Sequence, residues 1–441
     1  MGGMVPEQTA NDMTYAELAE DYAGPFDPNW SLERLTRKAL ARLCREYMVV
    51  SMYHDRALMP HVALAVGQDA TIKQADSEWM GSSPIYTERN KKNLNISGDG
   101  ASEALKSFQF DVGAPHHFLD FHFQEVDHDL GVFWLPFCGA HHYLRELTAN
   151  DEQLVTNMCH HMEDRTFDAT LAATNPKLRA IPVHRPPKPD EFTGDHCRWE
   201  IQIVDEEPGP RPGEPSEAVV RQSAAANFEF DLGESLEPGG MDDYSGPLRP
   251  DFRLEDLSHA VLVRQAKEFA LDVHLLMRAA YFSIDENFSP ELLGDAAPQH
   301  RAAMAPVMVE RLCEAMGITG DGMETIAKVL QLDPILVDDY VRYSVTVHDD
   351  ATGSIEFHDC AGVGDDVCRS PLDWLDGFEH MAQAVNPRCR ATQTGERSWD
   401  LHIDPDADPV EPHWLADGIG SGGLRTFDLS ERRVQLTVKP S

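Results

Sequence analysis

One spacing relates two long stretches of this 441-residue chain, and it limits the possible folds more than any other feature. Residues 28–62 resemble residues 250–284, and residues 121–140 resemble residues 343–362, both at a spacing of 222. A spacing kept without a gap from residue 28 to residue 140 indicates a tandem duplication. The identical positions are Pro28, Leu32, Glu33, Leu35, Leu40, Arg42, Glu46, Arg56 and Ala57, repeated as Pro250, Leu254, Glu255, Leu257, Leu262, Arg264, Glu268, Arg278 and Ala279.

The two copies differ in length toward their ends. Residues 167–180 match residues 378–391 at a spacing of 211, and the strand-like "CRWEIQI" matches "RSWDLHI", which places Trp199 on Trp399. The sequence therefore predicts five parts. They are an N-terminal tail (1–27), a first repeat (28–204), an acidic linker rich in Pro and Gly (205–249), a second repeat (250–404) and a C-terminal tail (405–441).

Each copy has the same predicted layout. It opens with apolar residues at helical spacing, continues through a helical middle, and then shows two strands around a turn that contains Gly. A helix that ends near "TNP" and two closing strands complete the unit, because Pro cannot continue a helix. This order predicts an α+β fold of two homologous domains, each a helical half with a small antiparallel sheet and packed helices. The linker reads as mostly disordered or loosely packed.

The formal net charge of −38 bears on partners and location. Nucleic acid and anionic membrane surfaces both select clustered Lys and Arg, so neither is an expected partner. No apolar run reaches the ~18–20 residues of a membrane helix, and no signal-peptide pattern is visible. Eight cysteines in a chain of this length do not form a disulfide scaffold, so we expect a cytoplasmic protein of undetermined oligomeric state with a small-molecule substrate.

Cysteine and histidine are concentrated in the first copy, most densely in "NMCHHMEDRTF" (157–167). Features that both copies share are expected to serve the fold, whereas features of one copy are candidates for function. Cys159, His161 and Glu163 fall on Ser370, Leu372 and Trp374, whereas Phe167 recurs as Phe378. The cluster is therefore specific to the first copy, although its helix belongs to the repeat. We expect the first copy to be the active domain and the second copy to be a degenerate scaffold or lid.

Thiolate and imidazole groups are ligands for Zn²⁺ or Fe²⁺, so this concentration suggests a metal site. On a helix, Cys159 and Glu163 lie one turn apart on one face. Glu163 would act as general base toward a metal-bound water, with Cys138 and His161 also catalytic, in a cleft that Tyr53 and His54 can reach. The predicted metal ligands are Cys138, His142, Cys159, His161 and Cys197.

Four other interpretations stay open. Cys138 or Cys159 can be a nucleophile with a histidine base, and the same ligands can hold non-haem iron in an oxidoreductase. A ligand-binding or sensor protein would instead use its paired domains to clasp a small apolar molecule, in a pocket without convergent Cys and His. The histidines can also be solvated or structural.

The order of elements is similar to that of a known family. It has a hairpin that ends in Cys, a helix that ends in "NP", and a closing strand with Cys197, Trp199 and Glu200. It resembles the L-2-amino-thiazoline-4-carboxylic acid hydrolases. The resemblance covers each repeat and implies an enzyme that cleaves a C–heteroatom bond of a small organic molecule by hydrolysis. This chain is doubled and rich in histidine, so the substrate does not transfer.

Overall fold

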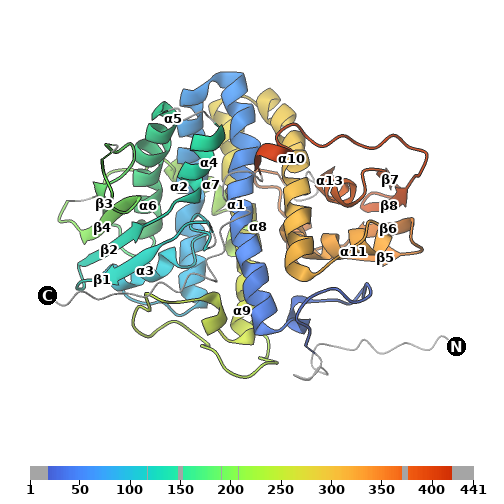
Figure 1. Cartoon of the computed structure of the whole chain (residues 1–441), viewed down its shortest axis with the longest axis horizontal. Coiled ribbons are helices and arrows are strands. Elements are labelled where there is room, and N and C mark those ends of the chain that lie inside the picture. The colour runs from blue at the N-terminus through green and yellow to red at the C-terminus, as the bar shows by residue number, and fades with distance from the viewer. Residues whose placement is uncertain are drawn as a thin grey trace.

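The computed structural model describes residues 18–116, 118–147, 152–189, 191–206, 208–369 and 376–419. Four long helices stand in the middle of the molecule, and a four-stranded sheet lies on each side of them (Figure 1). The long helices are α1 (Arg37–Val66), α2 (Gln68–Asn93), α9 (His259–Asn287) and α10 (Pro290–Met316). The predicted α+β class is confirmed.

The first sheet is antiparallel, has the strand order β1-β2-β4-β3, and is covered by α3 and α6. Its register places Phe133 opposite Phe123 on one side and opposite Trp199 on the other, so three aromatic side chains form one buried layer. The elements are α3 (Ala101–Phe108), β1 (His122–Glu125), β2 (Leu130–Leu135), α4 (Gly139–Leu147), α5 (Glu152–Thr156), a π-helix (Asn157–Met162), α6 (Glu163–Ala172), β3 (Leu178–His184) and β4 (Cys197–Ile203).

The second sheet repeats this topology in the order β5-β6-β8-β7. The elements of the second copy start at the predicted spacings from those of the first. A spacing of 222 residues separates the first residues of α9, α10, α11 and β6 from those of α1, α2, α3 and β2, and a spacing of 211 separates β7 from β3. Pro84 inside α2 likewise recurs as Pro306 inside α10. The elements are α11 (Met323–Leu332), β5 (Tyr343–Val347), β6 (Thr352–Phe357), α12 (Ala361–Gly364), α13 (Asp376–Val385), β7 (Cys389–Gln393), β8 (Ser398–Ile403) and α14 (Ala416–Ile419).

The long helices pair across the repeat rather than within it. Helix α1 packs along both α10 and α9, and α9 packs mainly along α2. Salt bridges follow the same rule: Arg89 of α2 binds Glu268 of α9 with both nitrogens at 3.0 and 3.1 Å. The equivalent Arg311 of α10 binds Glu46 of α1 at 2.6 and 2.9 Å. The helical halves of both copies therefore share one bundle with a continuous apolar core.

The segment ahead of each first helix also crosses to the other copy. Ala19 forms a parallel bridge with Leu35, as Met241 does with Leu257, so the correspondence extends upstream of residues 28 and 250. The Tyr22 hydroxyl donates to Gln331 in α11 at 2.7 Å, and the equivalent Tyr244 donates to Gln109, just after α3, at 3.0 Å. We call residues 18–36 and 240–258 the two straps.

The linker between the copies is more ordered than its composition predicts. It contains α7 (Glu214–Val220) and α8 (Ala224–Asn227), and α7 lies against α2. Val220 and Ala225 have no accessible surface, so the prediction of a mostly disordered segment is wrong for this part of the chain.

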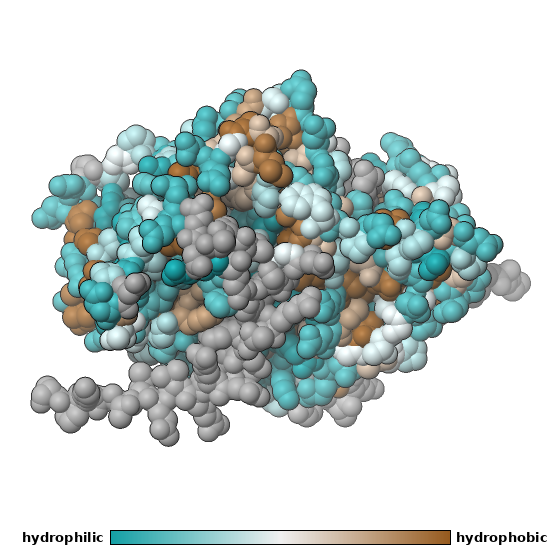
Figure 2. Space-filling view, turned by 45° about the horizontal axis from the view of Figure 1, so that its top comes forward, coloured by the Kyte–Doolittle hydropathy of each residue, from teal (hydrophilic) through white to brown (hydrophobic). Residues whose placement is uncertain are grey.

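The surface and the helices agree with the expected physical character. None of the helices in the described ranges combines the length and the apolar content needed to span a bilayer. Hydrophilic residues dominate the face seen in Figure 2, where apolar side chains form only small areas, as expected for a strongly acidic chain.

Candidate metal centre

The structure places the three predicted cysteine ligands in one buried region of the first sheet. Cys138 follows β2, Cys159 lies in the π-helix and Cys197 begins β4, and their exposed fractions are 5%, 1% and 4%. Burial, and then the negative charge of Glu163, raise the pKa of all three thiols. Thiols with such raised pKa values stay protonated, which makes them weak nucleophiles.

The two predicted histidine ligands lie differently. His161 is exposed, and it lies near Asp76 on α2, where it opposes the rise in the pKa of that carboxyl that burial causes. The ring of His142 lies 5.8 Å from the ring of Phe137. The segment that carries Cys159 and His161 is a π-helix, a form often found at functional sites. In this π-helix, Nε2 of His160 lies 2.8 Å from the carbonyl oxygen of Pro186 and forms a hydrogen bond with it.

A different set of metal-capable side chains meets in the core of the bundle. Within the described ranges, one group of three His, Cys, Asp or Glu residues brings its ligand atoms within 4.8 Å of one another, and it consists of His54, Asp55 and Glu78. His54 and Asp55 lie on α1 and Glu78 lies on α2. The side chains of His54 and Glu78 have no accessible surface.

The contact between His54 and Glu78 is short, but it is not a hydrogen bond. His54 Nε2 and Glu78 Oε1 lie 2.8 Å apart, yet both atoms are buried without a hydrogen-bond partner because they are not aligned for one. A buried polar atom without a partner costs about 1–3 kcal/mol. Metal–ligand bonds of about 2.0–2.2 Å place neighbouring ligand atoms roughly 2.8–3.1 Å apart at right angles, which is the separation seen here.

Neighbouring side chains hold the two carboxyl groups in place. Trp79 Nε1 lies 3.2 and 3.0 Å from the two oxygens of Asp55. Gln74 Nε2 lies 3.3 Å from Glu78 Oε2 and 3.1 Å from the carbonyl of Ala280. Metal ligands in proteins are commonly oriented by such outer contacts.

Burial sets the protonation of the centre. It raises the pKa of Glu78 to about 7, although hydrogen bonds from Asp55 and Gln74 lower it in part. Burial, the charge of Glu78 and the hydrogen bond with Glu78 raise the pKa of Asp55 well above its usual range. Burial also lowers the pKa of His54 to about 4, so its ring is neutral at pH 7. Two carboxyl groups and a neutral imidazole are a suitable ligand set for a divalent cation, which displaces the acidic protons when it binds.

The second copy contributes two residues, His300 and Tyr281, that extend the contacts from His54 away from Glu78. His300 on α10 places Nε2 2.9 Å from His54 Nδ1, and the hydroxyl of Tyr281 on α9 lies 3.1 Å from His300 Nδ1. All four long helices therefore contribute one side chain each to the series Glu78, His54, His300 and Tyr281. His300 stands at the position of Glu78 in the second copy, at the spacing of 222.

Sequence reasoning reached this centre only in part. It placed His54 within reach of a site, but it did not identify Asp55, Glu78 or His300 as members. The available signal was weak. It consisted of polar residues, His54 and Asp55 in one long helix and Glu78 in the next, at positions where the surrounding residues of each helix are mostly buried. The density of Cys and His elsewhere in the first copy was the stronger pattern.

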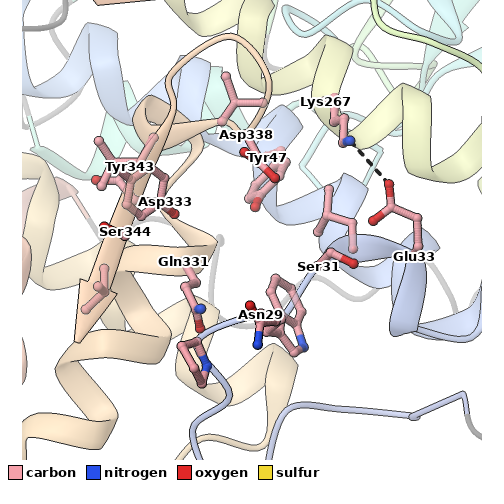
Figure 3. A pocket seen from close by; sticks show the side chains of 16 residues that line it. Asn29, Ser31, Glu33, Tyr47, Lys267, Gln331, Asp333, Asp338, Tyr343 and Ser344 are labelled. Atoms are coloured by element: carbon pink, nitrogen blue, oxygen red, sulfur yellow. Dashed lines mark hydrogen bonds and ion pairs between the residues drawn. The ribbon is translucent and has the colours of Figure 1, made fainter. Parts of the chain in front are cut away.

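A separate pocket of about 290 Å³ lies between the two copies. One wall is the first strap, with Asn29, Ser31 and Glu33, and the opposite wall comes from the region of α11 and β5 in the second copy (Figure 3). Tyr47 of α1 also lines it, and Lys267 of α9 bonds Glu33 at 3.3 Å at its edge. Among the described residues, no cysteine or histidine lines this pocket.

The fold and the site thus define an α+β protein with two sheets of the same strand order and a polar centre inside a shared helix bundle. No protein-family model, no curated protein and no solved structure matches the chain. The resemblance to L-2-amino-thiazoline-4-carboxylic acid hydrolases therefore stays a prediction, and the function has to be argued from the site.

Proposed function

We propose that this protein is a metal-dependent enzyme whose ion is held by His54, Asp55 and Glu78. The observation that supports the proposal is the 2.8 Å contact between two buried ligand atoms that have no hydrogen-bond partner. A cation between them would satisfy both atoms. The predicted cysteine set gives weaker support, because the described residues of that region do not bring three ligand atoms within 4.8 Å of one another.

The donor atoms indicate the kind of ion. One imidazole nitrogen and two carboxylates are hard to borderline ligands, which suit Fe²⁺, Mn²⁺ or Zn²⁺ and disfavour a soft ion such as Cu(I). Carboxylates and histidines that project into a helix bundle are a known way to hold iron or manganese. We therefore favour iron or manganese over zinc.

Burial of the centre favours small reactants. Because His54 and Glu78 have no accessible surface, an organic substrate reaches the ion only if the bundle opens. A molecule of the size of water, dioxygen or peroxide needs far less room. The buried position of the centre therefore favours an oxidoreductase over the hydrolase that the cysteine-rich segment suggested, in which the metal would activate a water.

Metal analysis of the purified protein tests the proposal. We expect about one Fe or Mn ion per chain, lost in His54→Ala and Glu78→Gln but kept in Cys138→Ser and Cys197→Ser. Circular dichroism checks that each variant is folded. Metal that disappears with the cysteine variants, or a wild-type protein without bound metal after growth with added iron and manganese, contradicts the proposal.

The pocket between the copies supports a second candidate, a ligand-binding role. The pocket lies between the two copies, and its lining mixes apolar side chains with three acids, Glu33, Asp333 and Asp338, and one base, Lys267. Aromatic rings of Trp30, Tyr47 and Tyr343 complete it. Carboxylates beside aromatic faces suit an organic ammonium ion.

Calorimetric titration with phenethylamine tests this second candidate. We expect saturable binding that weakens in Asp338→Asn and is unchanged in Asp129→Asn, an exposed acid at the first sheet. Equal binding by both variants, or no binding by the wild type, removes the support for an ammonium ligand in this pocket.

A further inference from the structure

Two side chains of the second copy continue the series that begins at the candidate metal centre. His300 and Tyr281 are both buried, at 0% and 1% exposure, and they come from α10 and α9. The series Glu78, His54, His300 and Tyr281 is joined by separations of 2.8, 2.9 and 3.1 Å. The second copy is therefore in direct contact with a residue that we assign as a ligand.

The direction of the hydrogen bonds decides whether His54 can bind a metal. A neutral histidine carries one ring proton, so its second nitrogen is an acceptor. If His54 Nδ1–H donates to His300 Nε2, then Nε2 of His54 keeps its lone pair for a cation. His300 must in that case carry its proton on Nδ1, where the oxygen of Tyr281 accepts it.

The reverse direction blocks the site. If the hydroxyl of Tyr281 donates to His300 Nδ1, then His300 Nε2–H donates to His54 Nδ1. His54 then carries its proton on Nε2, 2.8 Å from Glu78 Oε1 and not aligned with it. Only the first direction leaves three converging acceptor groups at His54, Asp55 and Glu78.

We propose that His300 and Tyr281 are positioning residues that hold His54 in the tautomer that binds the metal. This inference rests on the proposed metal centre and adds a role for the second copy, which supplies part of the site rather than only a scaffold or lid. The hydrogen-bond partner of a ligating histidine commonly fixes its tautomer and ring orientation.

Metal affinity of histidine variants tests the inference. Loss of an outer partner of a ligating histidine typically weakens metal binding about 10–100-fold, so we expect a loss in that range for His300→Leu. His300→Gln offers a side-chain oxygen as acceptor and should restore affinity to within a few-fold of the wild type. Tyr281→Phe should weaken affinity by a smaller factor, because it removes only the outer acceptor.

His274→Leu is the matched control. His274 is also completely buried in α9, but its Nε2 bonds the carbonyl of Ile335 at 3.1 Å, outside the series. Its loss should affect stability without changing metal affinity. The readouts are the Kd for Mn²⁺ from a chelator competition and the electron paramagnetic resonance spectrum of the bound Mn²⁺, with circular dichroism to confirm folding.

The outcomes separate the two proposals. A wild-type protein that binds no ion, or a His54→Ala variant that binds it as well as the wild type, defeats the metal centre itself. Binding that depends on His54 but is equal in His300→Leu and His274→Leu defeats only the positioning role. The same holds if His300→Gln is as weak as His300→Leu. If His300→Leu does not fold, His300→Gln and Tyr281→Phe still decide the question.

Discussion

Glu163 shows how one half-buried acid affects the chain without any metal. It begins α6, next to the three buried thiols, and burial raises its pKa from 4.5 to about 7. The positive charge of Arg185 lowers the pKa only in part. Because the folded state binds this proton more tightly than the unfolded state does, the contribution of Glu163 to stability is present below pH 4.5. It is lost as the pH rises through 7.

We expect Glu163→Gln to stabilise the protein relative to the wild type at pH 8 more than at pH 5. The amide never ionises, so the difference in free energy of unfolding should grow by about 1–3 kcal/mol over this range, less than the full pKa shift because the side chain is partly exposed. Urea unfolding at both pH values measures it. Glu125→Gln, on an exposed end of β1, is the control and should show no such growth.

Sequence reasoning identified the residues that look reactive and missed those that the fold makes unusual. Cys138, Cys159 and Cys197 lie in one buried region and influence one another's pKa, but among the described residues they do not form a group of three ligand atoms within 4.8 Å. Glu78 is chemically an ordinary acid, and it becomes a candidate ligand only because α2 is buried against neighbours that include α1 and α9. Burial of a single side chain depends on its tertiary partners, which periodicity does not reveal.

At the scale of elements, close backbone contact explains why α7 is ordered. A Cβ on Gly213 would lie 2.3 Å from the backbone of Met80, and a Cβ on Gly81 would lie 2.5 Å from the side chain of Ser216. Two glycines therefore allow the start of α7 to touch α2. Composition alone predicted a flexible linker. Pro, Gly and acidic residues are common both in flexible linkers and in ordered ones, so composition does not distinguish the two.

We expect Gly213→Ala to destabilise the protein, because an added methyl group meets backbone rather than a movable side chain. Overpacking of this kind costs about 1–3 kcal/mol, and the helix would have to shift away from α2. Thermal unfolding followed by circular dichroism measures the change. Gly209→Ala is the control, since a Cβ there has open space around it. Equal midpoints for both variants would show that α7 does not pack as described.

The repeat spacing predicted the positions of the elements well, but it did not predict their partners. Helices α9, α10 and α11 begin at the spacing of 222, as the alignment of the copies requires. The pairing of α1 with α10 and of α9 with α2 was not foreseen. An apolar stripe shows that a helix buries one face, and in a duplicated chain either copy offers an equivalent surface to cover it.

At the scale of the whole molecule, equivalent salt bridges join the copies in both directions. Arg89 to Glu268 and Arg311 to Glu46 are one such pair of contacts, and Arg45 to Glu255 and Lys267 to Glu33 are another. The side chain of Glu268 is only 1% exposed and that of Glu46 is 12% exposed. Breaking a buried pair on one side leaves the other charge without compensation.

We therefore expect Glu268→Gln to cost more stability than the equivalent Glu46→Gln. Loss of one partner from a buried ion pair typically costs about 3–5 kcal/mol, and a more exposed pair costs less. Combining Glu268→Gln with Arg89→Met should recover part of the loss, since no buried charge is left unpaired. Denaturant unfolding of the four proteins gives the comparison. A smaller effect of Glu268→Gln than of Glu46→Gln would contradict the order of burial.

The crossed arrangement also predicts how the molecule responds to a cut between its copies. A protease site inserted between Gly209 and Pro210, both exposed, separates the two repeats covalently. Each strap and each first helix nevertheless packs on the other copy, through contacts such as Tyr22 with Gln331 and Tyr244 with Gln109. We expect both fragments to elute together in size-exclusion chromatography at the position of the intact chain, and to separate only in denaturant. An uncut sample of the same insertion variant is the control. Fragments that separate under native conditions, each still folded, would show that the copies are independent domains and that the shared bundle does not hold them together.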